Sequence, residues 1–171
     1  EWGIFDYSQQ EPRLVVHYAN KNGFPGAGKF LDSYQKDNNT DFHTMVSEIA
    51  DIPRKQAKTI NLGLFYGMGK GKLMSELGVN IEEATELLQS YHERVPFVKK
   101  LTYDTQGIAS KNGFLTTIQG RRCRFDLWES ELEWGKKALP EEEAEREYGK
   151  KTIKRAWTYK ALNKLIQGPA A

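Results

Sequence analysis

The sequence is organised around residues 54–67, RKQAKTINLGLFYG. Four side chains there are spaced four residues apart, so on a helix they share one face: Arg54, Lys58, Leu62 and Tyr66. Two cations, an aliphatic residue and an aromatic ring would then follow one another over ~18 Å. This order suits a nucleoside triphosphate, which is anionic at one end and flat at the other. The spacing alone also fits an ordinary amphipathic helix with a solvated basic edge, which is the commoner structure.

A carboxylate near the start of the chain adds a second feature. Residues 3–8 are short and aromatic, as in a buried strand, and they contain Asp6. A carboxylate at the end of a strand is well placed to hold Mg²⁺, which prefers oxygen ligands and serves in-line phosphoryl transfer. Taken alone, an Asp that caps or turns the chain is the commoner alternative.

Composition sets limits on the class of protein. The 171 residues carry 25 basic and 23 acidic side chains, so the net charge alone does not indicate a nucleic-acid binder. Residues 54–72 nevertheless hold basic residues and no acid, whereas residues 129–147 are rich in acid. The single cysteine, Cys123, cannot form an internal disulfide, which is typical of a reducing compartment. Since no apolar run approaches ~20 residues, we expect no membrane-spanning segment.

The first fifty residues predict two helices and a loop. Apolar residues return at helical spacing over residues 11–19, and residues 41–50 predict a short helix that Asp41 caps. Between them, residues 20–39 are rich in Gly, Asn, Lys and Asp, which indicates a loop.

The central helix has its own start and stop signals. Asp51 and Pro53 predict an N-cap followed by proline in the first turn. The helix should run to about Tyr66, and the glycine-rich run 67–72 should then form a hinge-like loop.

The remaining chain predicts helices and one β-hairpin. Residues 79–103 repeat the helical pattern on both sides of Pro96, and residues 113–125 predict a β-hairpin. Residues 126–151 form a charged, exposed insertion in this interpretation, and residues 152–166 a last helix ended by glycine and proline. The predicted fold class is therefore mixed α+β.

Four segments in order resemble the family A DNA polymerases, which include bacterial polymerase I and phage replicases. Residues 6–13, DYSQQEPR, resemble motif A, and residues 54–67 resemble motif B, R-x₃-K-x₃-(F/Y/L)-x₃-Y-G. Residues 117–122, TIQGRR, resemble the T-x-x-G-R-R turn of the family, and residues 161–168, ALNKLIQG, resemble the palm helix that precedes motif C. The resemblance covers essentially the whole chain, and the motif A form and the last helix are more similar to phage members than to bacterial ones.

The resemblance implies part of a right-hand polymerase fold, α+β, mostly helical with a few antiparallel strands. Residues 1–19 would be a palm segment with motif A. Residues 20–112 would be the fingers subdomain with the motif B helix over 53–66. Residues 113–171 would return to the palm with the hairpin and a minor-groove helix, so that the polymerase domain is incomplete.

For the chemistry, the resemblance implies two-metal phosphoryl transfer with Mg²⁺. Asp6 would bind both catalytic ions, and the backbone carbonyl of Tyr7 would bind the ion that holds the triphosphate. Arg54 and Lys58 would contact the incoming triphosphate, and Lys58 would also donate a proton to the departing pyrophosphate. His43 would be a third phosphate partner, although it lies closer to Arg54 in sequence than in bacterial members.

The resemblance also implies how the sugar and the base are recognised. Glu11 would press on the sugar and exclude a 2′-hydroxyl, with a hydrogen bond to Tyr66, and Gln10 would belong to the same nucleotide-binding set. Tyr66 would pack by the nascent base pair. Leu62 stands where bacterial enzymes usually have Phe and some phage enzymes Tyr, which affects the choice of sugar.

The implied function is template-dependent addition of deoxynucleotides to a primer 3′ end in DNA replication, in the host cytoplasm if the protein is viral. Asn163 and Gln167 would reach the minor groove of primer–template DNA, where acceptors common to all base pairs permit sequence-independent contacts. Tyr159 and Pro169 depart from the residues that bacterial members have at those positions.

Both ends resemble interior sequence, so we expect a fragment of a longer or split polymerase. The His-Asp-Glu turn with the second metal carboxylate does not occur, and neither does a thumb. We therefore expect no primer extension by the chain alone, and we expect the missing palm and thumb segment, or a second polymerase subunit, as a partner.

Three other classes remain open. A single-subunit RNA polymerase has a similar fingers helix but would be expected to have a small residue in place of Glu11. A P-loop NTPase is suggested by residues 23–29, GFPGAGK, although Phe30 follows where Ser or Thr should bind Mg²⁺. A plain nucleic-acid-binding module would show salt-sensitive binding without selectivity for triphosphates. Among other polar and aromatic residues, we expect packing roles for His17, His92, Trp128 and Trp134.

Overall fold

The computed structural model describes residues 8–170. The strand predicted at residues 3–8, with Asp6 and Tyr7, therefore falls almost entirely outside the described residues. The described chain forms two compact units, one extending to Thr102 and one from Tyr103 to Pro169. The division falls within helix α7 (Pro96–Asn112), and the subdomain boundaries expected from the sequence stay a prediction.

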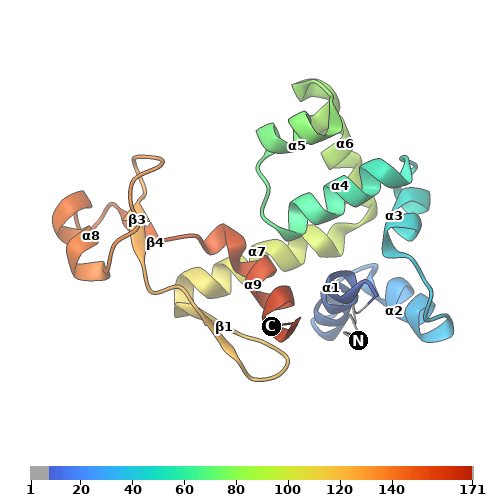
Figure 1. The fold of residues 1–171 in the computed structure, drawn as a ribbon, viewed down its shortest axis with the longest axis horizontal. Helices are drawn as coiled ribbons and strands as arrows, with labels where there is room; N and C mark the ends of the chain where they lie inside the picture. Colours follow the sequence, from blue (N-terminus) through green and yellow to red (C-terminus); the bar gives the residue numbers. More distant parts are fainter. Residues whose placement is uncertain (1–7, 171) are drawn as a thin grey trace, which may run out of the picture. The chain divides into compact units, whose positions relative to one another are not determined.

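The first unit is helical (Figure 1). Its helices before α7 are α1 (Gln10–Lys21), α2 (Ala27–Lys36), α3 (Phe42–Ala50), α4 (Arg54–Phe65), α5 (Lys70–Leu77) and α6 (Ile81–Arg94). Helix α3 packs against α4, and α1 packs against α2.

Four buried phenylalanines form the centre of this unit. Phe30 of α2 lies 5.0 Å from Phe42 of α3 and 5.1 Å from Phe97 of α7, measured between ring centroids. Phe65, at the end of α4, lies 6.0 Å from Phe42. Because truncating such a ring to alanine typically costs about 3–5 kcal/mol, this cluster holds four helices together.

The loop predicted for residues 20–39 is wrong, because α2 occupies its middle. Ala27, Phe30 and Tyr34 are all buried and recur at helical spacing. Many polar and glycine residues surround these three, so the helical spacing of the apolar residues is weak in the sequence. Residues 27–29 of the P-loop-like stretch also belong to this helix.

The junction between α3 and α4 differs from the sequence prediction at Asp51 and at Pro53. Asp41 caps α3 as expected, and its Oδ1 accepts a hydrogen bond of 2.8 Å from the Thr44 amide. Asp51 does not cap α4, because it ends α3 in the left-handed region with φ 53°. Pro53 is the N-cap of α4 instead, and α4 ends at Phe65, close to the predicted end.

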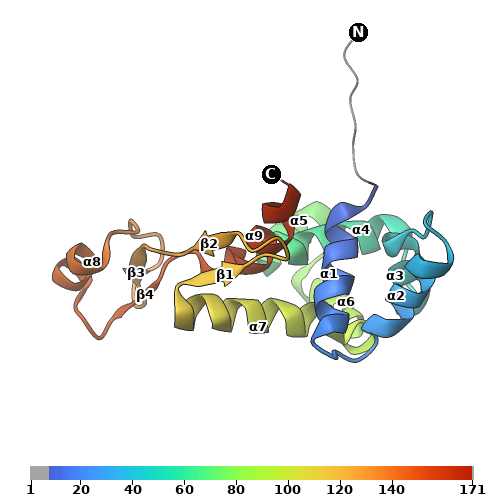
Figure 2. The same cartoon turned by 90° about the horizontal axis from the view of Figure 1, so that it is seen from below.

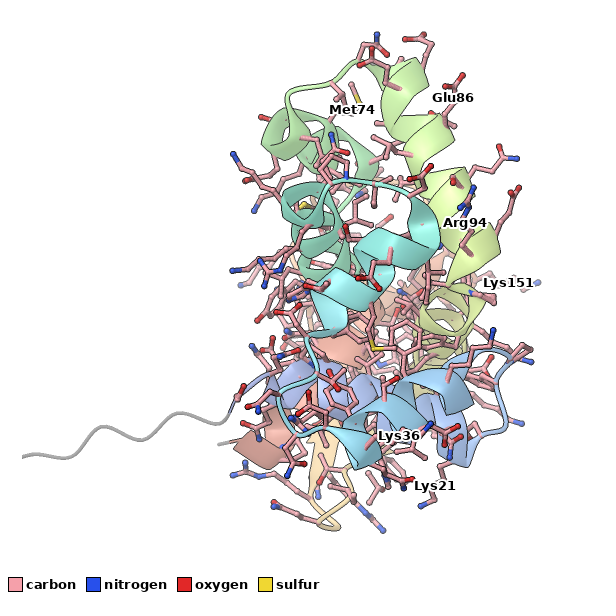
Figure 3. All side chains as sticks on the ribbon, turned by 90° about the vertical axis from the view of Figure 1, so that its right-hand side faces the viewer. Lys21, Lys36, Met74, Glu86, Arg94 and Lys151 are labelled. Atoms are coloured by element: carbon pink, nitrogen blue, oxygen red, sulfur yellow. The ribbon has the colours of Figure 1, made fainter. Side chains whose placement is uncertain are left out.

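The glycine-rich run after α4 is shorter as a loop than predicted. Helix α5 already begins at Lys70 after Gly69, and it buries Leu73. Helix α6 then begins with a capping box between Asn80 and Glu83. Figure 3 shows Arg94 on α6, and its Nη1 donates a 3.0 Å hydrogen bond to the carbonyl of Ile49 at the end of α3.

The second unit contains the predicted β-hairpin. Strands β1 (Phe114–Thr116) and β2 (Arg122–Arg124) pair antiparallel, with Leu115 opposite Cys123. Gly113 begins the hairpin with φ 74°, a backbone conformation that glycine adopts without the strain that other residues would have there. The hairpin lies beside α9 (Ala161–Gln167) (Figure 2).

The helix predicted over residues 152–166 is confirmed only in its second half. Strand β4 (Ile153–Arg155) pairs antiparallel with β3 (Trp128–Ser130), and Trp157 then adopts φ 58°. A short 3₁₀ turn (Thr158–Lys160) leads into α9, and a second one (Gly168–Ala170) follows it. Residues 153–155 form a strand because they pair with β3, and the local sequence carries no signal for this pairing.

The insertion after the hairpin is charged, as predicted, but it is structured. It holds β3 and helix α8 (Glu141–Tyr148), while residues 131–137 are exposed. The guanidinium of Arg155 lies 4.7 Å from the Trp128 ring centroid, so this tryptophan does pack. Trp134 does not, because its side chain is completely exposed at 103%. Within residues 8–170, no helix combines the length and apolar character needed to cross a bilayer.

Candidate functional site

The predicted face of α4 exists as a row of accessible side chains. Arg54 and Lys58 are exposed, Leu62 is half-buried, and Tyr66, the C-cap residue, is 40% exposed. Ala57, Ile60 and Phe65 of the same helix are buried in the core. The helix is therefore held by the core while Arg54, Lys58 and Tyr66 remain exposed to solvent.

Arg54 is held in place by α3. Its Nη2 lies 2.6 Å from Oδ2 of Asp41, and its Nε donates to Oγ1 of Thr44 at 3.1 Å. Burial would raise the pKa of Asp41, but the hydrogen bonds and the charge of Arg54 hold that pKa below its usual value. Because one carboxylate balances only part of the local charge, the start of α4 remains cationic.

His43 lies behind this cationic end. It is buried, and its Nδ1 lies 2.9 Å from Nδ2 of Asn61, a fully buried residue of α4. The hydroxyl of Tyr91 on α6 donates to Oδ1 of Asn61 at 2.5 Å. Burial lowers the pKa of His43, and the charges of Arg54 and Lys58 lower it further against the opposing effect of Asp41. The ring is therefore neutral near pH 7.

The other end of the α4 face meets α1. The hydroxyl of Tyr66 donates a hydrogen bond of 2.7 Å to Oε1 of Glu11. The expected bond between these residues is thus present. Glu11 lies in the first turn of α1, and Gln10 is the first residue of the same helix. No side-chain hydrogen bond within residues 8–170 defines a role for Gln10, so its place in the nucleotide-binding set stays a prediction.

Gln9 fixes where α1 begins. It adopts the left-handed region with φ 53°, which is uncommon for a non-glycine residue. Its Nε2 donates to the carbonyl of Thr40 at 3.0 Å, and its Oε1 accepts from the amide of Phe42 at 2.8 Å. The start of α1, and with it Glu11, is thereby tied to the start of α3.

Comparison with known proteins identifies the family. The model for "DNA polymerase family A" matches residues 2–171, which is nearly the whole chain. The chain belongs to DNA polymerase family A. The expected fold class, α+β and mostly helical with a few antiparallel strands, is also confirmed.

Relatives of this family A chain come from phages and bacteria. It is 34% identical to a DNA-directed DNA polymerase of Pseudomonas phage M6 over 99% of its length, and 33% identical to DNA polymerase I of Bacillus caldotenax over 71%. The chain spans only 28% and 14% of these two relatives.

One solved structure resembles the chain over nearly its whole length. It is the POL domain of Pol1 from M. smegmatis in complex with DNA primer-template and dNTP. The TM-score is 0.67 at 26% identity, over 96% of this chain and 26% of that one.

The metal-binding residues that the family resemblance implies, Asp6 and Tyr7, lie outside the described residues. Within residues 8–170, no group of three or more His, Cys, Asp or Glu side chains could hold a metal ion. His17 and His92 each stack edge-on against a neighbouring tyrosine. Nothing in the described part of this family A chain assigns them a ligand.

The second unit holds the two residues expected to contact DNA. Asn163 and Gln167 lie one turn apart on α9, with Gln167 exposed and Asn163 half-buried. Nδ2 of Asn163 is buried without a hydrogen-bond partner among the described residues. Nη1 of Arg121, from the T-x-x-G-R-R turn, donates to the carbonyl of Gly168 at 3.2 Å, which fixes the turn against the end of α9.

Sequence reasoning missed the residues that support the site: Gln9, Thr44, Asn61 and Tyr91. A signal existed for Asn61, which stands between Ala57 and Phe65 at spacing four and so on the buried face of α4. A buried amide requires partners. Its actual partners come from α3 and α6, and nothing local in the sequence identifies them.

Proposed function

We propose that this chain forms the nucleotide-binding part of a DNA-directed DNA polymerase, which adds deoxynucleotides to a primer 3′ end under the direction of a template. One observation carries the proposal. The exposed face of α4 runs from Arg54 and Lys58 to Tyr66, and Tyr66 is bonded to Glu11 of α1. A cationic end and an aromatic end with a carboxylate beside it match the order of phosphates, sugar and base.

The cationic end would hold the triphosphate. Lys58 is exposed and forms no salt bridge within residues 8–170, so its charge is available to an anion. Arg54 is already oriented by Asp41 and Thr44, which reduces the entropy lost when it binds a phosphate. Charges placed in advance at the transferring phosphoryl group stabilise the transition state, and Lys58 would also protonate the departing pyrophosphate.

The aromatic end would select the nucleotide. The carboxylate of Glu11, hydrogen-bonded to Tyr66, would occupy space beside the sugar, so a 2′-hydroxyl there would have neither room nor a partner. Leu62, between the two ends, is half-buried and apolar, and it offers no hydrogen bond to a sugar. The ring of Tyr66 is accessible to stack near the base pair.

Magnesium remains a proposal from the sequence. Asp6 and the carbonyl of Tyr7 are the proposed ligands, and a bound pair of ions would stabilise the attacking and leaving oxygens of an in-line displacement. The residues described here act on the rest of the substrate, through the charges of Arg54 and Lys58 and the bulk of Glu11.

Primer–template DNA is the proposed second substrate. Gln167, which is exposed, and Asn163, which is half-buried one turn earlier on α9, would contact the minor groove. The related Pol1 domain from M. smegmatis forms a complex with primer-template and dNTP, which supports both ligands for this chain. The Pseudomonas phage relative supports a phage-type replication enzyme. A further palm and thumb segment, or a second subunit, would supply the remaining parts of the active site.

The test is primer extension by the complete polymerase that carries these residues. Each of the four template bases should direct incorporation of its complementary deoxynucleotide, and Asp6→Asn should abolish it. A preference for ribonucleotides would favour an RNA polymerase. ATP hydrolysis without DNA would favour an NTPase, and salt-sensitive DNA binding without incorporation would favour a simple binding module.

A further inference from the structure

A row of buried, hydrogen-bonded polar side chains connects the cationic end of the α4 face to α6. Tyr91 is fully buried, Asn61 is fully buried, and His43 is 7% exposed. The Tyr91 hydroxyl lies 2.5 Å from Oδ1 of Asn61, and Nδ2 of Asn61 lies 2.9 Å from Nδ1 of His43. Three residues from α3, α4 and α6 therefore form one continuous hydrogen-bonded relay.

The chemistry of the three groups fixes the direction of the relay. A phenol has one proton to donate, a carboxamide oxygen only accepts, and a carboxamide nitrogen only donates. With Tyr91 donating to Oδ1, Nδ2 must donate to Nδ1 of His43. Nδ1 is then an acceptor and carries no proton, so the proton of the neutral ring is on Nε2.

Turning the amide of Asn61 around would leave the relay unsatisfied. Its NH₂ group would face the hydroxyl of Tyr91, and that buried hydroxyl makes no other hydrogen bond within residues 8–170 that could take up its proton. A buried donor without an acceptor is costly. The arrangement with Tyr91 as donor is the one in which the Tyr91 hydroxyl, both ends of the Asn61 amide and Nδ1 of His43 are all hydrogen-bonded.

We propose that Tyr91 and Asn61 are positioning residues that hold His43 as a neutral Nε2–H donor for the triphosphate. This inference rests on the proposed function and deepens it. Arg54 and Lys58 supply the positive charge, and His43 adds a fixed hydrogen bond without adding a third cation to the site.

The surroundings of His43 favour a neutral ring that donates a hydrogen bond, beside the two cations Arg54 and Lys58. Burial lowers the pKa of His43 most, Asp41 opposes this effect, and the charges of Arg54 and Lys58 lower the pKa further. Nε2 makes no hydrogen bond within residues 8–170, so it remains for a ligand. The orientation of the ring is set before the ligand arrives, which lowers the entropic cost of binding.

The first experiment reads the tautomer directly. The chain has three histidines, so ¹⁵N-labelled histidine and NMR correlations between ring nitrogens and ring protons can assign His43. The expected result is a protonated Nε2 and a bare Nδ1 at neutral pH. A protonated Nδ1 in the unaltered chain would overturn the relay.

Asn61→Asp tests the direction of the relay. A carboxylate cannot donate, so Nδ1 of His43 should gain a proton, and the pKa of His43 should rise. Asn80→Asp is the matched control, because Asn80 is the exposed cap of α6 and Asp also caps a helix. The tautomer of His43 should not change in that variant. An unchanged tautomer in Asn61→Asp would also overturn the relay.

The second experiment links the relay to substrate. Deoxynucleoside triphosphate, added to the complete polymerase with primer–template, should shift the Nε2 resonance of His43. In the same enzyme, Tyr91→Phe should raise KM for the deoxynucleotide about fivefold and leave kcat and the Kd for DNA unchanged. If Tyr91 had a purely structural role, Tyr91→Phe would instead impair KM, kcat and the Kd for DNA together.

The two ways of failing are distinguishable. If the triphosphate binds but the His43 resonance does not shift, the donor role is overturned while the proposed function stands. If His43 carries its proton on Nε2 but no deoxynucleotide binds at all, the proposed function fails, and the relay is a structural feature only.

Discussion

The hydroxyl of Tyr66 donates a hydrogen bond of 2.7 Å to Oε1 of Glu11, a residue 55 positions earlier in the chain. The bond joins the C-cap of α4 to the first turn of α1. Because the bond is exposed to solvent, we expect it to add little to folding stability. Its consequence is positional, since it fixes the carboxylate beside the aromatic end of the α4 face.

Tyr66→Phe removes this bond and keeps the ring. We expect the preference for deoxynucleotides over ribonucleotides to fall about fivefold, because the carboxylate of Glu11 loses the hydrogen bond from Tyr66 and is held less firmly. Folding stability should change little. Competitive incorporation and chemical denaturation measure the two effects, and an unchanged preference would mean that Glu11 needs no support from Tyr66.

Lys58→Ala should lower the rate of incorporation ~10²–10³-fold, because a preorganised charge acts mainly in the transition state. Lys58→Arg should recover only part of the rate, since its charge has a different shape. Lys36→Ala is the matched control, because Lys36 is an exposed lysine of α2 that does not belong to the α4 face. Single-turnover kinetics and DNA binding should be measured together. If Lys58→Ala weakened DNA binding alone, in a salt-dependent way, Lys58 would be a duplex contact instead.

Leu62→Tyr tests the middle of the face. The new hydroxyl can supply a hydrogen bond that Leu62 lacks and that can replace the one lost with a missing 3′-hydroxyl. Use of dideoxynucleotides should therefore rise about fivefold or more, while the exclusion of ribonucleotides stays unchanged. Chain-termination assays measure the first effect and ribonucleotide competition the second. A simultaneous loss of ribonucleotide exclusion would show that the two discriminations are not separate.

Asp41 contributes to folding stability as the cap of α3 and as the partner of Arg54. Asp41→Ala loses the cap of α3 and should lower the free energy of unfolding by ~1 kcal/mol. Asp41→Asn keeps an acceptor for the Thr44 amide and should cost less, because the partly exposed pair with Arg54 contributes little.

The pH dependence of Asp41 has a definite sign. Its folded-state pKa is lowered below the ordinary 3.8, so the carboxylate stabilises the fold above that pH. This stabilisation should be lost as the pH falls through the lowered pKa. Denaturation curves should be measured between neutral and acid pH. The free energy of unfolding should fall less over this range for Asp41→Asn than for the unaltered chain. Equal losses would contradict the role of this ion pair.

The features that the sequence predicted well are those with local signals. The spacing of Arg54, Lys58 and Tyr66 and the hairpin over residues 113–125 are of this kind. Helix α2 was missed because three buried residues had to outweigh many polar and glycine neighbours. Strand β4 was missed because its structure depends on pairing with β3, more than twenty residues earlier.

The site followed the same rule. The residues on the exposed α4 face were identifiable from the motifs, but those that hold them were not. Asn61 depends on His43 and Tyr91, which lie 18 and 30 positions away. Gln9 depends on the chain at Thr40 and Phe42. Such contacts are products of tertiary packing, and a single sequence does not encode them as a local pattern.

The most direct test of the α4–α1 site is competitive incorporation of a single nucleotide by the complete polymerase and its Glu11→Ala variant. Loss of the carboxylate opens the space beside the sugar, so ribonucleotide incorporation should rise ~10²-fold relative to deoxynucleotide incorporation. The rate of deoxynucleotide incorporation itself should fall by much less than this factor. An unchanged preference in Glu11→Ala, with deoxynucleotide incorporation intact, would contradict the placement of the sugar beside Glu11 and with it the proposed nucleotide site.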